Sequence, residues 1–113
     1  STAGAHLLKV FTELGIAEEL SGRLHEFPNG NAAMNALGAA DGMLELGATM
    51  MTEIKPVKSV DSVGPLPGRL QSVTMYTAGI AARSLQPLLA REFVTRLTGP
   101  DARPMLAEAG FLP

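Results

Sequence analysis

The sequence contains no cysteine among its 113 residues, which excludes a disulfide framework and a thiolate metal site. It has no apolar run of about 18 residues or more, so no segment reads as a membrane-spanning helix. It also lacks a basic excess, because nine scattered lysines and arginines face eleven acidic residues and leave a net charge of −2. Nucleic-acid-binding domains usually carry a basic patch. We therefore expect no nucleic-acid partner.

The composition that remains is typical of a globular chain. Hydrophobic residues make up 46% and charged residues 18%, which argues against disorder. A chain of 113 residues is one domain's worth and can bury a core. It opens at Ser1 with neither a methionine nor a signal-like segment, so we expect a mature form, an expressed piece or a fragment.

The first half of the sequence combines helical and strand patterns. Leu7, Leu8, Phe11 and Leu14 share one helical face over residues 5–14, with Ser1 or Thr2 as N-cap and Gly15 as the stop. The pattern further predicts helices over 17–24 and 31–40, strands over 25–27, 44–51 and 57–63, and a turn over 52–54.

Two prolines and two glycines in the stretch GPLPG, residues 64–68, forbid regular structure, and we place a hinge or domain crossing there. Residues 70–82 then predict a long strand. Ser84 is predicted to cap a helix that has Pro87 in its first turn and ends near Leu97. We expect that helix to bury Leu88, Leu89, Phe93, Val94 and Leu97. A last helix starts at residues 98–100 and ends at Gly110.

Predicted strands alternate with predicted helices, which indicates an α/β class with at least partly parallel strands. No internal repeat or low-complexity tract is present.

The end of the chain resembles the C-terminal signature of type 2 periplasmic solute-binding proteins of ABC transporters. The stretch AREFVTRLTGPDAR (90–103), closing on AGF (109–111), is similar to that family's "F..FL.SP.A" turn and "..GF.P" end. The molybdate-binding branch is the most similar. Three further stretches fall in matching order: Ala3-Gly4 before a helix carrying Leu14-Gly15, the helix start Asn29-Gly30-Asn31, and Leu46-Gly47-Ala48-Thr49 before Thr52-Glu53.

The resemblance implies a two-lobed receptor of which this chain is the C-terminal half. Residues 1–63 correspond to the later half of the second, ligand-binding lobe, residues 64–68 to the hinge, and residues 69–113 to the return segment of the first lobe with its C-terminal helices. The implied fold is a periplasmic-binding-protein type 2 lobe with a mixed, mainly parallel sheet flanked by helices, incomplete without the N-terminal part. The implied location is the periplasm and the implied partner is a transporter permease. Uncovered sheet edges predict a homo-oligomer or strand exchange.

Two helix starts are candidate ligand sites, because the first amides of a helix have no partner within it and lie at its positive end. They are Thr2-Ala3-Gly4-Ala5 and Asn29-Gly30-Asn31-Ala32. Receptors of the resembled family use matching helix starts for oxyanions. The alternative explanation for the second start is a capped helix, with Asn31 as N-cap and Gly30 as a turn residue.

One position departs from the molybdate branch. Where those proteins carry a tyrosine whose hydroxyl reaches the oxyanion, this sequence has Met50. A thioether cannot donate a hydrogen bond. The change argues against molybdate or tungstate as the specific ligand, and opens the site to a less charged or more apolar solute.

Other chemistry is weakly signalled. His6 follows a candidate ligand loop and is a candidate contact, as is Tyr76, whereas His25 is expected at a strand edge. No catalytic residue, metal site or cofactor is predicted, since the carboxylates are isolated and no phosphate loop or nucleophile elbow occurs. The sequence therefore favours a binding protein over an enzyme. An effector-sensing or oligomerisation module of a regulator is the alternative, and a neighbouring DNA-binding segment would favour it.

Overall fold

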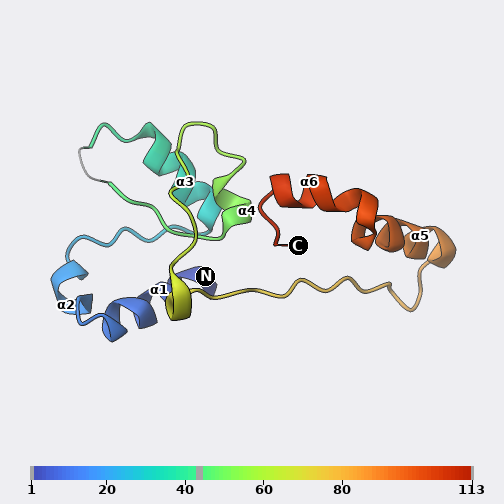
Figure 1. The fold of residues 1–113 in the computed structure, drawn as a ribbon, viewed down its shortest axis with the longest axis horizontal. Coiled ribbons are helices and arrows are strands. Elements are labelled where there is room, and N and C mark those ends of the chain that lie inside the picture. Colours follow the sequence, from blue (N-terminus) through green and yellow to red (C-terminus); the bar gives the residue numbers. More distant parts are fainter. Residues whose placement is uncertain (1, 43–44, 113) are drawn as a thin grey trace. The chain divides into compact units, whose positions relative to one another are not determined.

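The computed structural model describes residues 2–42 and 45–112. The chain separates into two compact units, Ser1–Ser72 and Val73–Pro113, which are described one at a time. Unit 1 contains the helices α1 (Thr2–Glu13), α2 (Ala17–Leu20), α3 (Gly30–Ala39) and α4 (Met51–Ile54) and the 3-10 turn η1 (Gly68–Leu70) (Figure 1). Unit 2 contains α5 (Pro87–Thr98), the 3-10 turn η2 (Pro100–Ala102) and α6 (Arg103–Glu108).

The first helix forms where its apolar spacing predicts it. Val10 is the buried residue of α1, whereas Leu8 and Leu14 of the predicted apolar face are 48% and 46% exposed. Gly15 follows with a φ of 71°, a backbone conformation that favours glycine, and this ends the helix as predicted. The predicted second helix is shorter than expected, since α2 ends at Leu20. Thr2 is the first described residue of α1, and the alternative cap, Ser1, lies outside the described residues.

The centre of unit 1 is the contact between α3 and α4. Met34 on α3 is only 1% exposed and is the most deeply buried large side chain of the described residues. Gly47 lies so close to Met34 and Leu37 that a Cβ atom at this position would collide with both side chains. Val57, just after α4, is also buried. A small set of apolar side chains therefore positions the start of α3 against the segment that leads into α4.

The predicted α/β class is wrong for the part of the chain that the structure describes. No residue in 2–42 or 45–112 belongs to a strand, so there is no mixed, mainly parallel sheet. The segments 25–27, 45–50, 57–63 and 71–82 are irregular or extended, and residue 44 lies outside the description. Residues 51–54, predicted as a strand end and turn, form the helical turn α4.

The physical reason is that a strand is defined by its neighbour. Alternating or β-branched residues favour an extended backbone, but a ladder forms only where a second extended segment supplies amide and carbonyl partners. Such a partner is not found among the described residues of either unit.

Unit 2 begins with an extended segment and ends with helices. Pro87 occupies the first turn of α5, as predicted, but Gln86 stands at the cap position without a side-chain hydrogen bond. Ser84 instead accepts a hydrogen bond from the amide of Gln86 at 3.2 Å, outside the helix. Gly110, with a φ of 99°, ends the last helix as predicted. Phe111 packs edge-on against Tyr76, with ring centroids 5.5 Å apart.

The predicted apolar face of α5 is not buried within the described residues. Leu88, Leu89 and Phe93 are 81%, 62% and 65% exposed, and Val94 and Leu97 are half-buried. The helical spacing is as predicted, but the described part of unit 2 supplies too few apolar side chains to cover it.

Candidate functional site

Helix α3 begins at Asn29, which is its N-cap. The backbone of Asn29 is extended, and its Oδ1 atom accepts a hydrogen bond from the amide of Ala32 at 2.8 Å. The predicted cap, Asn31, instead lies in the first turn, where its Oδ1 accepts a hydrogen bond from Asn35 Nδ2 at 2.9 Å. Both Asn29 and Asn31 are exposed, and Gly30 between them is buried. The helix start is therefore well capped, two positions earlier in the sequence than the alternative explanation placed it.

A carboxylate of the chain itself lies at this helix start. The amide of Gly30 donates to Glu53 Oε1 at 3.2 Å, and the hydroxyl of Thr49 donates to Glu53 Oε2 at 2.5 Å. A Cβ atom at Gly30 would collide with both Thr49 and Glu53, so only glycine allows this approach. The positive end of α3 thus faces an acidic side chain delivered by α4.

The other candidate start, that of α1, has different surroundings. Thr2 is exposed, whereas Ala3 and Gly4 are half-buried. The described first turn of α1 contains no acidic residue. His6, one turn further, is half-buried, and its Nε2 lies 2.8 Å from the carbonyl oxygen of Leu70.

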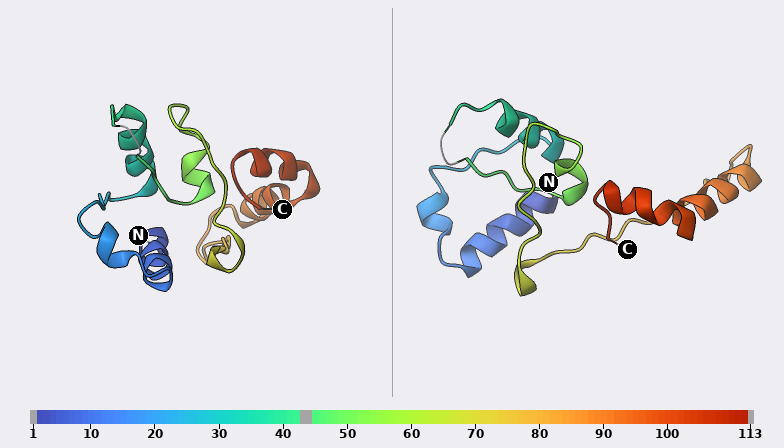
Figure 2. Two further views of the ribbon diagram at one scale, coloured as in Figure 1. Left: turned by 60° about the vertical axis from the view of Figure 1, so that its left-hand side comes forward. Right: turned by 45° about the horizontal axis from the view of Figure 1, so that its top comes forward.

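The two helix starts belong to the same unit. In Figure 1 and in the right-hand view of Figure 2, α1 and α3 begin on the side of unit 1 that carries α4. The residues predicted to contact a ligand, 2–6 and 29–31, therefore gather on one side of the unit.

Met50 lies next in sequence to the contact between Gly30, Thr49 and Glu53, because it directly follows Thr49 and stands at the cap position of α4. Its backbone is extended, with φ −69° and ψ 144°, and the residue is half-buried. Its thioether provides no hydrogen-bond donor. With only four residues, α4 is too short to present a helix dipole of its own.

Sequence reasoning missed the contact of Thr49 and Glu53 with the start of α3, since the pattern predicts only a turn over residues 52–54. The usable signal was their spacing. Thr49 directly precedes the cap residue of the helical turn, and Glu53 is the third residue of that turn, from which a glutamate side chain can reach back across the helix start. That spacing becomes informative only if residues 51–54 are recognised as helical.

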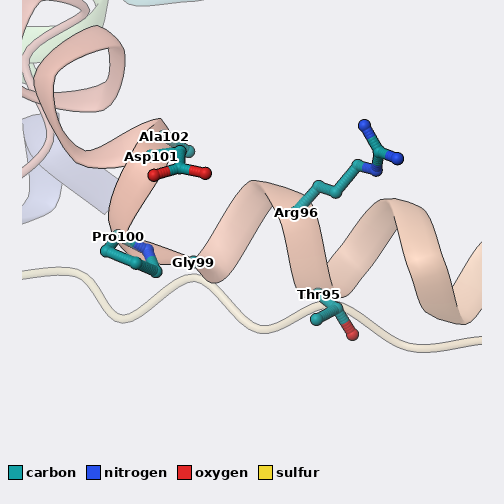
Figure 3. Close-up of a pocket in the computed structure, with 6 residues that line it drawn as sticks. All are labelled: Thr95, Arg96, Gly99, Pro100, Asp101 and Ala102. Carbon is teal, nitrogen blue, oxygen red and sulfur yellow. The ribbon is translucent and has the colours of Figure 1, made fainter.

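A shallow hollow lies elsewhere, in unit 2, at the junction of α5 and η2 (Figure 3). Arg96 extends away from Asp101 in this view, and its guanidinium pairs with Glu92 at 2.8 Å. Because the cation is already engaged by a carboxylate, the hollow offers no evident anion site. Its lining residues are Thr95, Arg96, Gly99, Pro100, Asp101 and Ala102.

The described residues contain neither a cluster of metal ligands nor a membrane-spanning helix. Within residues 2–42 and 45–112, no three histidine or acidic side chains come together as metal ligands. No helix in the described ranges has the length and apolar character needed to cross a bilayer.

Comparison with known proteins gives a family match across the chain. The model of a family described as bacterial extracellular solute-binding protein matches residues 1–112. An aconitate isomerase from Pseudomonas sp. is 31% identical over 74 residues, which cover 66% of this chain and 28% of that relative. The matched part thus spans under a third of the relative's length. No solved structure shows significant similarity.

Proposed function

Because the chain belongs to the family of bacterial extracellular solute-binding proteins, we propose that it is part of the substrate-binding component of an ABC-type uptake system. The component binds a small solute between two lobes and delivers it to a transporter permease. Binding needs no catalytic residue. The family description supports a periplasmic or extracellular location, and the periplasm is our proposal.

The observation that carries this proposal is the extent of the family match, residues 1–112. A match to one short motif would support only a local resemblance, whereas this one includes the helix starts, residues 64–68 and the C-terminal helices. In the proposed arrangement, residues 1–63 belong to the ligand-binding lobe, residues 64–68 form the crossing, and residues 69–113 belong to the other lobe.

The first turn of α1 is the better of the two starts for an anionic group of the solute. It has no acidic side chain in its described first turn, and the first amides of a helix lie at its positive end. The start of α3, by contrast, already faces Glu53. An oxyanion such as molybdate therefore fits the α1 start better, and Met50 supplies no hydroxyl to hold it.

Isothermal titration of the whole protein that contains this chain tests the proposal. The panel includes molybdate, sulfate, a tricarboxylate, an amino acid and a neutral sugar. We expect one class to bind with a Kd of about 1 μM or tighter, which corresponds to about −8 kcal/mol. A Kd weaker than about 1 mM for every class would contradict a receptor function for these solutes.

A second candidate function is supported by one observation, the relative named aconitate isomerase. An isomerase of an unsaturated carboxylic acid would need a group that moves a proton, and His6 and Glu53 are two titratable side chains that contact residues of unit 1 at or near the helix starts. Both already make hydrogen bonds within unit 1.

Proton NMR of the whole protein incubated with aconitate distinguishes the two functions. Conversion between the isomers that is lost on His6→Phe or Glu53→Gln would favour the isomerase. Binding of a solute without conversion would favour the receptor.

A further inference from the structure

We propose that Glu53 is a specificity-determining residue, whose carboxylate fills the positive end of α3 and excludes anionic groups of a solute from that end. The group of the solute that faces α3 is then a hydrogen-bond donor, such as a hydroxyl or an ammonium group. The consequence for solute choice rests on the proposed function, whereas the contact itself can be tested without it.

The first step of the argument is the occupancy of the amides. A helix presents its unpaired amides in the first turn, and an anion binds there by accepting from them. In α3 two of these amides already donate to side chains of the chain itself, Gly30 to Glu53 Oε1 and Ala32 to Asn29 Oδ1. An incoming anion would have to replace the first of these acceptors.

The second step is the way Glu53 is held. Its other oxygen accepts from the Thr49 hydroxyl at 2.5 Å, a length typical of a charge-assisted O–H···O⁻ bond. Thr49 directly precedes the cap residue Met50, and Glu53 is the third residue of α4, so the Glu53 side chain reaches back across the start of the helix to Thr49. The carboxylate is therefore positioned from two sides, by Gly30 and by Thr49.

The third step is steric. Gly30 is buried, and the space beside its Cα atom is taken by Thr49 and the carboxyl group of Glu53. An anion at this amide would meet both a filled volume and a like charge. A carboxylate has about four lone-pair positions, so it can still accept from a solute hydroxyl or ammonium group.

The experiment uses the full 113-residue chain, ¹⁵N-labelled, with sodium sulfate as the probe against sodium chloride at equal ionic strength. In the wild type we expect the Gly30 and Ala32 amide resonances to show no sulfate-specific shift. In Glu53→Ala both resonances should move with sulfate, with an affinity at least about tenfold higher than in the wild type. Glu26→Ala is the matched control, because it removes the same charge from an exposed position shortly before α3 and should leave the response unchanged.

Glu53→Gln keeps the size of the side chain and an oxygen that can accept from the Gly30 amide. This variant replaces Glu53→Ala in the titration if circular dichroism shows that Glu53→Ala has lost its helices. It should also gain sulfate affinity over the wild type, because the like charge is gone. Sulfate binding at Gly30 in the wild type, or no gain in either Glu53 variant, would overturn the proposal. If the Gly30 resonance responds as expected but the whole protein binds no solute, the proposed function fails and the role of Glu53 at α3 stands.

Discussion

His6 Nε2 lies 2.8 Å from the carbonyl oxygen of Leu70 and thereby joins α1 to η1 across 64 positions of sequence. Because a carbonyl oxygen only accepts, Nε2 must carry the proton and donate it. Arg69, the neighbour of Leu70, pairs with Glu13 at the end of α1. Two polar contacts therefore hold η1 along α1, and η1 begins at Gly68, the last residue of the predicted hinge (64–68). His6 thus has a structural contact besides its predicted ligand role.

Replacing His6 by phenylalanine should lower the stability of unit 1. A planar aromatic ring is retained, but the hydrogen bond to Leu70 is lost, and the free energy of unfolding should fall by about 1 kcal/mol. Urea denaturation followed by circular dichroism measures the change. His25→Phe is the control, because His25 is exposed and its replacement should stay within about 0.5 kcal/mol. Equal losses in both variants would contradict a specific role for the contact with Leu70.

Replacing Asn29 by alanine should fray the start of α3. The side chain satisfies the amide of Ala32, and loss of an N-cap typically costs about 1 kcal/mol. Asn31→Ala is the matched control, since Asn31 is exposed and its side chain contacts only Asn35 among the hydrogen bonds of this turn. We expect its effect to stay below about 0.5 kcal/mol. Thermal unfolding of the two variants side by side decides which asparagine is the cap, and a larger loss for Asn31→Ala would contradict the assignment.

Replacing Gly30 by alanine should separate α3 from Glu53. The new methyl group would collide with Thr49 and Glu53, and such overpacking usually costs about 1 to 3 kcal/mol. Gly22→Ala is the matched control, because nothing lies within 4 Å of the added atom. Its stability should be unchanged or higher by up to about 1 kcal/mol. A Gly30→Ala protein as stable as Gly22→Ala would show that the approach of Glu53 to the helix is not close.

The helices were predictable because their determinants are local. The stop at Gly15, the proline in the first turn of α5 and the end at Gly110 each depend on the backbone preference of one residue. The strands were not predictable in the same way, because the residue pattern over 70–82 favours an extended backbone but does not indicate which segment would pair with it. A sheet forms only where a neighbouring extended segment supplies backbone hydrogen bonds, and the described residues contain no such pair of segments.

The candidate site was predicted only in part, for a related reason. The sequence locates a helix start near Asn29-Gly30-Asn31, since polar residues precede an alanine-rich pattern. It does not show that Glu53, 23 positions away, reaches Gly30. That contact depends on the packing of α4 against α3, with Met34 buried beneath and Gly47 close to it. The start of α3, predicted as an anion site, therefore already binds the carboxylate of Glu53, a residue distant in the sequence.

The exposed apolar residues of α5 lead to a last prediction, that the isolated chain associates with itself. Leu88 and Leu89 are 81% and 62% exposed, and covering a leucine side chain typically contributes about 1.5 to 3 kcal/mol. Light scattering at micromolar concentration should give a mass above that of one chain. The double variant Leu88→Gln and Leu89→Gln should shift the mass toward a monomer, whereas Arg91→Gln, an exposed polar position on the same helix, should leave it unchanged. A wild-type chain that is monomeric under these conditions would contradict the predicted oligomer. It would also show that Leu88 and Leu89 remain exposed to solvent in the isolated chain.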